Sequence, residues 1–244
     1  EDYIYFIYTT LINMAVGSGL ILLGRGAENR VTRRDGYCIV AFTWLLFTGF
    51  GMLPFYISGS IPSVTDAFFE TMSGFTTTGA TILDDIEALS HGMLFWRSFS
   101  QWIGGLGIVF FTIAVLPIFG VGNQVLFSAE ATGVTHDKIH PKISVMAQCL
   151  WTVYLVLTVA EIVLLLIGGM DLFDAACHAF STTATGGYST KQASVAYWNS
   201  PFIEYVIAIF MILSGINFSL YFMCMKGRCG QLFKDGELRL YLIS

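Results

Sequence analysis

The chain alternates long apolar runs with short polar segments, and five of the runs are long enough to cross a bilayer. These runs cover residues 3–23, 37–57, 93–119, 143–169 and 201–225. Because a helix needs about 20 mostly apolar residues to span the hydrocarbon core, each run predicts a transmembrane helix. The pattern is typical of an all-α membrane protein that crosses its membrane several times.

Two shorter apolar segments interrupt this pattern, at residues 64–75 and 172–181, and each begins close to an Asp-Ala pair. Helices of this length cannot cross the hydrocarbon core. Non-helical backbone at membrane depth is tolerated only where protein buries it or where it lines a water-filled path. We therefore predict two re-entrant half-helices, which enter the membrane and leave it on the same side.

The order of these elements divides the chain into two similar units. One transmembrane helix precedes two copies of a unit that consists of a helix, a half-helix, a polar loop and a second helix. The predicted divisions are an N-terminal helix with a cytoplasmic loop, a first pore unit, a cytoplasmic linker, a second pore unit and a final cytoplasmic linker, at residues 1–36, 37–119, 120–142, 143–225 and 226–244.

A polar motif rich in threonine and glycine follows each half-helix. Glycine adopts positive φ without steric cost, so it can turn neighbouring carbonyl groups toward a common axis. In ion filters such carbonyls replace the hydration shell of a cation, and the C-terminal end of a helix favours positive charge. We therefore predict a cation filter formed by Thr76, Thr77, Thr78, Gly79, Thr183, Ala184, Thr185 and Gly186.

The two motifs can be aligned on their glycines. Pairing Gly79 with Gly186 also pairs Thr76 with Thr183. In this alignment Asp66 and Asp174 differ by one position, so we expect one half-helix to be one residue shorter than the other.

Composition and charge agree with a membrane protein. The chain is 55% hydrophobic and only 12% charged, with a mean hydropathy of +0.69, whereas soluble domains carry about 25% charged residues. Most basic residues lie in three segments, which the positive-inside rule makes cytoplasmic: Arg25, Arg30, Arg33 and Arg34; Lys138 and Lys142; Lys226, Arg228, Lys234 and Arg239. The acidic residues Asp84, Asp85 and Glu87 then lie outside, where they either concentrate cations or only keep an exposed loop solvated.

Other chemistries receive little support from the sequence. The cysteines are scattered without a Cys-x-x-Cys pair, which argues against zinc and redox sites. No phosphate-binding glycine loop occurs, so nucleotide regulation would have to come from a partner. We expect no organic cofactor, no nucleic-acid partner and no enzyme activity. Two alternatives remain: an intramembrane hydrolase that uses Ser73 with His178 or His91 as base, and a non-conducting membrane sensor subunit.

Several residues inside the apolar runs have a structural interpretation. For the cluster of Gly104, Gly105 and Gly107, close helix packing is favoured over a gating hinge. For Arg97, pairing with an outer-side acid or a pore-loop carbonyl, or extension of the side chain to the membrane interface, is favoured over ion binding. For Glu161 a hydrogen-bonded structural role is favoured, although ionisable residues in membrane helices are often functional.

The motifs together resemble the Trk/Ktr/HKT superfamily of potassium transporters. Residues 65–70 with 76–81 resemble its first pore segment, 95–107 are similar to the helix that follows in TrkH proteins, and 178–181 with 186–190 resemble the second pore segment. Asn217 and Phe218 also match. The resemblance covers nearly the whole chain.

The resemblance implies more than the residues show by themselves. It implies a pore of four such units, of which this chain holds two, so we expect the N-terminal half of a TrkH-like subunit and a missing C-terminal half. It implies potassium uptake in a bacterial inner (plasma) membrane, in contact with membrane lipid, by a homodimer gated by a cytosolic nucleotide-binding ring protein (TrkA-like). Glycine at the key filter position goes with potassium preference, so we expect K⁺ mainly on the backbone carbonyls of Thr77, Thr78, Thr185 and Gly186.

Overall fold

The fold is described by a computed structural model, which places residues 2–26, 33–107, 143–216, 220, 221, 224 and 235–243. The described residues form helices and connecting loops, and no β-strand occurs among them. This result confirms the all-α prediction.

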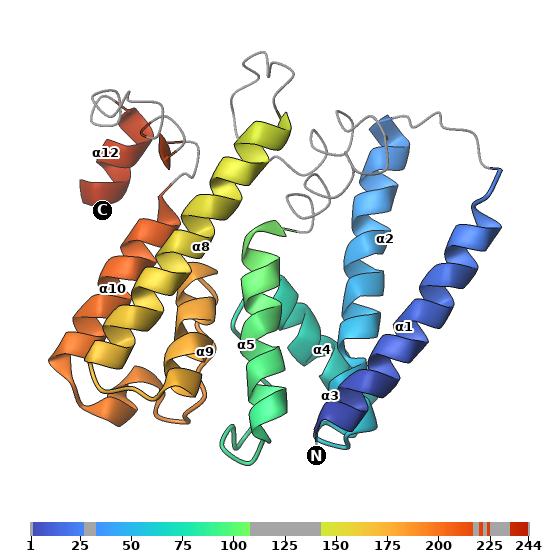
Figure 1. Cartoon of the computed structure of the whole chain (residues 1–244), viewed down its shortest axis with the longest axis horizontal. Helices are drawn as coiled ribbons and strands as arrows, with labels where there is room; N and C mark the ends of the chain where they lie inside the picture. The colour runs from blue at the N-terminus through green and yellow to red at the C-terminus, as the bar shows by residue number, and fades with distance from the viewer. Residues whose placement is uncertain are drawn as a thin grey trace.

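The longer helices are α1 (Tyr3–Leu23), α2 (Arg33–Gly51), α5 (His91–Gly105), α8 (Ile143–Ile167) and α10 (Pro201–Gly215). They run along a common direction (Figure 1). Among the described residues, Tyr3–Leu23 and Leu150–Ile167 are long and apolar enough to cross a membrane, while Ala41–Ile57 and Pro201–Gly215 are apolar but shorter. The shorter elements are α3 (Leu53–Ile57), α4 (Val64–Phe75), α9 (Leu172–Thr183), the 3₁₀-helix Ser194–Trp198 and α12 (Gly236–Ile243).

The helix predicted at 37–57 is two helices in the structure. α2 begins earlier, at Arg33, and ends at Gly51, and α3 begins after Met52. Pro54 lies in the first turn of α3, where its missing N–H is tolerated, whereas inside a continuous helix it would remove a hydrogen bond and clash with the preceding turn. The proline therefore explains the break.

Two other helices end earlier than predicted. α5 ends at Gly105 and α10 ends at Gly215. Glycine favours a helix end because it loses more conformational entropy in a helix than any other residue. Gly107 has a φ of +69°, which an α-helix cannot accommodate. Residues 108–119 and most of 217–225 lie outside the described part of the chain, as do both predicted linkers apart from 235–243.

The two half-helices form where the sequence predicts them, and they have equal length. α4 and α9 each contain 12 residues, so the expectation that one is shorter is wrong, and the segment predicted at 172–181 extends to Thr183. Ser63 and Asp171 cap their N-termini through side-chain oxygens that accept backbone N–H groups. Such caps satisfy donors that the first helical turn leaves unpaired.

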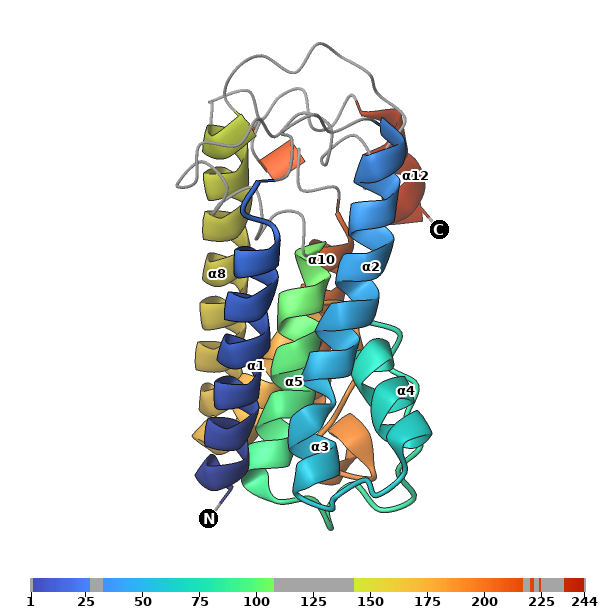
Figure 2. The same cartoon turned by 90° about the vertical axis from the view of Figure 1, so that its right-hand side faces the viewer.

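α5 is the element that joins the two half-helices. It packs against α4 on one side and α9 on the other, α8 and α10 cover α9, and α2 covers α4. Figure 1 shows α5 between the two short helices, both of which rise from the end of the bundle where α5 and α10 begin. Figure 2 shows α4 on the far side of α5 from α8. The C-terminal ends of both half-helices therefore point into the middle of the bundle.

Glycines on α5 allow this close approach. A Cβ on Gly104 would overlap the backbone carbonyl of Phe75, the last residue of α4. A Cβ on Gly105 would meet the Tyr154 hydroxyl at 2.6 Å and the Ala184 Cα at 2.8 Å. Both glycines are therefore packing positions, as the sequence favoured.

Substitution of Gly104 should destabilise the fold. In Gly104→Ala the new methyl group meets the Phe75 carbonyl carbon at 2.6 Å, and backbone cannot rotate away, so we expect a loss of about 1–3 kcal/mol. The measurement is the thermal unfolding midpoint of the full-length subunit in detergent. Gly17→Ala in α1 is the control, because nothing lies within 4 Å of its Cβ position. Equal midpoints for Gly104→Ala and the parent would contradict the packing argument.

Candidate functional site

The structure brings the two predicted polar loops into contact at the centre of the bundle. A Cβ on Gly79 would overlap the carbonyl oxygen of Gly186. The loops come from segments about a hundred residues apart in the sequence, yet their backbones touch. This contact is the geometric basis for treating them as one site.

The two loops also share one backbone conformation. Thr77 and Thr185 have φ values of 54° and 55°, and Gly79 and Gly187 have φ values of 75° and 90°. The backbone hydrogen bonds at the two helix ends also match, because three successive N–H groups donate four, three and five residues back along the chain. In the first unit these bonds are Thr76 N to Met72 O, Thr77 N to Gly74 O and Thr78 N to Ser73 O. In the second unit they are Ala184 N to Phe180 O, Thr185 N to Thr182 O and Gly186 N to Ser181 O.

This correspondence corrects the alignment made from the sequence. Gly79 is equivalent to Gly187, and Gly186 is equivalent to Thr78. Asp66 and Asp174 then fall at the same position, which is why the half-helices have equal length. The sequence could not distinguish the neighbouring glycines Gly186 and Gly187 because they are chemically identical, and only φ separates them.

The two glycines are required for different physical reasons. Gly187 has positive φ, a conformation that costs a residue with a Cβ energy. Gly186 does not have positive φ, but a Cβ there would lie 2.6 Å from Nε2 of Gln101 and closer still to the rest of its amide group. The first is a conformational requirement, and the second is a requirement for space.

A side chain of each half-helix hydrogen-bonds to the segment that follows its loop. Glu70 accepts hydrogen bonds from Thr81 Oγ1 and Ile82 N, both at 3.0 Å. At the equivalent positions of the second unit, His178 Nε2 lies 3.0 Å from Ser189 Oγ. The repeat therefore extends from the backbone to the side-chain hydrogen bonds, although the residue types differ.

A buried ion pair connects the two units. Arg97 Nε lies 2.6 Å from Glu70 Oε1, and both side chains are at most 2% exposed. Arg97 also donates to the carbonyl of Ser189 at 3.0 Å, and its guanidinium lies 3.8 Å from the ring centroid of Tyr188. Tyr188 in turn donates to the carbonyl of Glu70 at 2.9 Å. Charge-assisted hydrogen bonds of this kind hold geometry strongly.

Sequence reasoning found one side of this pair and missed the other. For Arg97 it anticipated an acidic partner or a pore-loop carbonyl, and the structure gives it both. Glu70 was not singled out, although a glutamate inside a short apolar segment is itself a signal, because burial of a carboxylate requires a partner.

Glu161 is a second buried carboxylate, on α8, and it contacts the end of α9. It is fully buried, and its Oε2 accepts from Thr183 Oγ1 at 3.5 Å. Thr183 is itself 3.4 Å from Thr158 Oγ1, which accepts from the indole N–H of Trp102 at 3.0 Å. The hydrogen-bonded role favoured from the sequence agrees with these contacts.

The residues of the alternative hydrolase site do not come together. Ser73 Oγ donates to the carbonyl of Ala80 at 2.6 Å. His178 is occupied by Asp174 O and Ser189 Oγ, and His91 stacks on Phe173 with a centroid distance of 4.5 Å. A nucleophile needs a base within hydrogen-bond reach, whereas in the described part of the chain Ser73 and His178 each hydrogen-bond to other groups.

The outer connections of the two units are also joined. Ile86 N donates to Gln192 Oε1 at 3.1 Å, and Gln192 N donates to Glu87 Oε1 at 3.2 Å. The exposed residues Asp84, Asp85 and Glu87 therefore lie beside the loop of the second unit. Figure 1 places the start of α5, which follows this acidic loop, at the opposite end of the bundle from the end of α1, which Arg25 follows.

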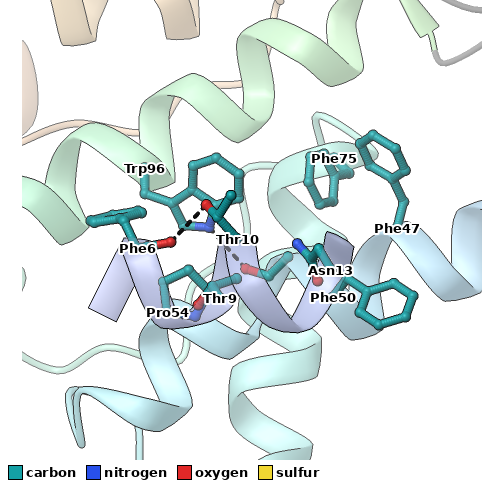
Figure 3. A pocket seen from close by; sticks show the side chains of 10 residues that line it. Phe6, Thr9, Thr10, Asn13, Phe47, Phe50, Pro54, Phe75 and Trp96 are labelled. Atoms are coloured by element: carbon teal, nitrogen blue, oxygen red, sulfur yellow. Dashed lines mark hydrogen bonds between the residues drawn. The ribbon is translucent and has the colours of Figure 1, made fainter. Parts of the chain in front are cut away.

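A lateral cavity of about 340 Å³ lies beside the site, between α1, α2, α3 and α5 (Figure 3). Half of its lining residues are aromatic, and they include Phe75 of α4 and Trp96 of α5. Thr9 and Thr10 bond to carbonyls of their own helix. With these hydroxyls engaged and half of the lining aromatic, the cavity offers a cation fewer oxygen ligands than the two loops do.

The chemistry available at the loops is that of neutral oxygen. Among the described residues there is no group of three or more His, Cys, Asp or Glu side chains that could hold a metal ion. The loops offer backbone carbonyls and threonine hydroxyls, with Thr76 Oγ1 and Thr78 Oγ1 2.8 Å apart. Such ligands suit a weakly hydrated monovalent cation better than a transition metal.

The ion pair should be important for stability. Glu70→Gln leaves Arg97 buried without a counter-charge, and breaking one side of a buried pair costs roughly 3–5 kcal/mol. We expect a much lower thermal unfolding midpoint for the full-length subunit in detergent. Replacing both residues, in Glu70→Leu with Arg97→Met, should recover part of the loss because no charge remains buried.

Glu87→Gln is the matched control for this experiment. Glu87 is exposed, and its amide replacement keeps the oxygen that accepts from Gln192 N, so the change should stay within about 0.5 kcal/mol. If Glu70→Gln behaved like Glu87→Gln, the ion pair would not support the fold.

Comparison with known proteins gives a consistent result. The family model described as TrkH, cation transport protein, matches residues 5–236. The chain is 42% identical over 240 residues to the Trk system potassium uptake protein TrkH of Escherichia coli K12, covering 97% of this chain and 50% of that protein. It is 36% identical over 244 residues to TrkG of the same strain, covering 99% of this chain and 50% of that protein.

A solved structure is similar throughout the chain. The crystal structure of the potassium transporter TrkH from Vibrio parahaemolyticus matches with a TM-score of 0.82 and 35% sequence identity, covering 99% of this chain and 49% of the other. The chain thus spans about half the length of the relatives that it matches.

Proposed function

The chain belongs to the TrkH family of cation transport proteins, and from this premise we propose that it forms half of a potassium-uptake pore whose filter includes the loops at 76–80 and 184–188. The observation that carries the proposal is the contact between two loops of equal backbone conformation, each at the C-terminal end of a buried half-helix. The helix ends favour a cation, and the loops offer neutral oxygens.

The proposed K⁺ ligands are mainly backbone carbonyls. The sequence placed them at Thr77, Thr78, Thr185 and Gly186, and the structural register supports this choice, because Thr77 corresponds to Thr185 and Thr78 to Gly186. Thr76, Gly79, Thr183 and Ala184 complete the predicted set, to which the register adds Gly187. The glycine pair Gly79 and Gly187 supports potassium over sodium, by the resemblance to the superfamily.

Two loops provide only part of a cation's coordination shell. We propose that the rest comes from two further units in a C-terminal half, which is consistent with relatives of twice the length. By the same resemblance, the complete subunit would form a homodimer in the bacterial inner membrane and would be gated by a TrkA-like cytosolic protein. No organic cofactor enters this proposal.

We propose that α4 and α9 are re-entrant and that the acidic loop faces outward. Both helices are too short to span a membrane, and the elements that precede and follow them meet at one end of the bundle (Figure 1). Arg25 and the N-terminal end of α2 lie at the other end, as the positive-inside rule requires of a cytoplasmic face. The remaining basic segments lie largely outside the described residues.

The direct test of function is potassium uptake by the full-length subunit. Expressed in bacteria that lack their own potassium uptake systems, it should restore growth at low potassium and take up K⁺ faster than Na⁺. A subunit that reaches the membrane but moves no K⁺ would contradict the proposal and favour the non-conducting sensor.

The filter glycines should control selectivity. Gly79→Ser and Gly187→Ser each add a side chain at a positive-φ position of the filter, so we expect the ratio of K⁺ to Na⁺ uptake to fall by about tenfold, which is 1.4 kcal/mol of discrimination. Gly59→Ser is the control, because Gly59 also has positive φ, 74°, but nothing lies within 4 Å of its Cβ position and it lies outside the loops. Unchanged selectivity in both filter variants would show that these loops do not line the ion pathway.

The orientation can be measured independently of transport. Asp85→Cys should react with an impermeant thiol reagent in intact cells, because Asp85 is exposed on the proposed outer loop. Arg25→Cys, at the other end of the bundle, should react only after permeabilisation. The reverse labelling pattern would overturn the orientation.

A further inference from the structure

Gln101 of α5 contacts both the second half-helix and the second filter loop through a single amide group. It is fully buried. Its Oε1 accepts from Ser181 Oγ at 2.7 Å and from the backbone N of Tyr188 at 3.2 Å. Ser181 precedes the filter loop and Tyr188 is its last residue, so Gln101 binds the chain at both ends of the loop.

The orientation of this amide is fixed by chemistry. A backbone N–H can only donate, so the group that faces Tyr188 N must be the amide oxygen. The NH₂ group must then point away from Tyr188. Nε2 is buried and has no hydrogen-bond partner among the described residues.

The unpartnered NH₂ group faces the place where the two loops meet. A Cβ on Gly186 would lie 2.6 Å from Nε2, and a Cβ on Gly79 would lie 3.9 Å from it. Gly186 is therefore packed directly on the amide, and Gly79 is packed on the Gly186 carbonyl. The contacts form a continuous series from Gln101 through Gly186 to Gly79.

A buried N–H donor without a hydrogen-bond partner costs folding free energy. The presence of such a donor beside the two loops therefore needs a functional explanation. Filter carbonyls that point toward one axis repel one another, and a nearby N–H donor reduces that repulsion. A rigid amide behind one loop also sets how closely the other loop can approach, because packed interiors leave few voids.

We propose that Gln101 is a positioning residue for cation selectivity: its amide oxygen fixes the second loop, and its NH₂ group supports the junction of both loops. This inference rests on the proposed potassium filter. It assigns to α5 of the first unit a direct influence on the filter loop of the second. It also explains why position 186 is glycine when the equivalent position in the first loop is Thr78.

The test uses the full-length subunit and measures the ratio of K⁺ to Na⁺ uptake at known amounts of protein in the membrane. Gln101→Glu keeps an acceptor for Ser181 and Tyr188 but loses the NH₂ group, and Gln101→Met, of similar size, loses both. We expect each to lower the ratio by about tenfold, Gln101→Glu because the junction of the loops loses its N–H donor and Gln101→Met because Ser181 and Tyr188 N also lose their acceptor. A merely structural role would lower the amount of protein and leave the ratio unchanged.

Gln192→Glu provides the matched control. It makes the same chemical change on an exposed outer residue whose Oε1 accepts from Ile86 N, and it should leave the ratio unchanged. If Gln101→Met does not accumulate, the isosteric Gln101→Glu carries the test.

A double variant tests the contact itself. Gly186→Ala should lower the ratio because its methyl group overlaps the Gln101 amide, and adding Gln101→Ala should cause a further change smaller than its effect alone, because the residues are in contact. Full additivity, or parental selectivity in both single Gln101 variants, overturns this inference. A parent that takes up no potassium overturns the proposed function instead, so the two failures are distinguishable.

Discussion

The guanidinium group of Arg97 is the point on which the arrangement of the two units depends. It lies in α5, pairs with Glu70 of the first half-helix and donates to the carbonyl of Ser189 beyond the second loop. A buried cation must be paired to remain charged, and a membrane interior offers no water as a substitute partner. The pair therefore helps to fix α4, α5 and the second loop relative to one another, in the arrangement in which the loops meet.

Close packing at glycine residues brings the two loops into contact. Gly104 and Gly105 let the ends of α4 and α9 approach α5 on two sides, and Gly186 lets the second loop lie on Gln101. Each of these glycines is needed for space, while Gly79 and Gly187 are needed for positive φ. Glycine thus serves two separate physical requirements within a few residues of each other. A pattern of threonine and glycine alone does not distinguish them.

The repeat is clearer in the structure than in the sequence because backbone geometry is conserved where side chains differ. Glu70 and His178 are chemically unlike, yet each bonds to the hydroxyl residue that follows its loop, Thr81 or Ser189. The alignment made on glycine alone was wrong by one residue for the same reason. Backbone φ angles and hydrogen bonds identify the equivalent positions of the two units even where the residue types differ.

The sequence by itself determined the helical class, the two short helices and the two polar loops, because these follow from local composition and from the lengths of apolar runs. The family followed from the resemblance of particular motifs. The sequence also indicated that Arg97 would be paired. The tertiary structure alone decided the register of the second loop, the partnership of Arg97 with Glu70 and the contacts of Gln101. These depend on contacts between residues far apart in the chain: Gln101 and Ser181 are 80 positions apart, and Tyr188 and Glu70 are 118 apart. No local pattern encodes which distant groups meet, since that is settled by how the helices pack.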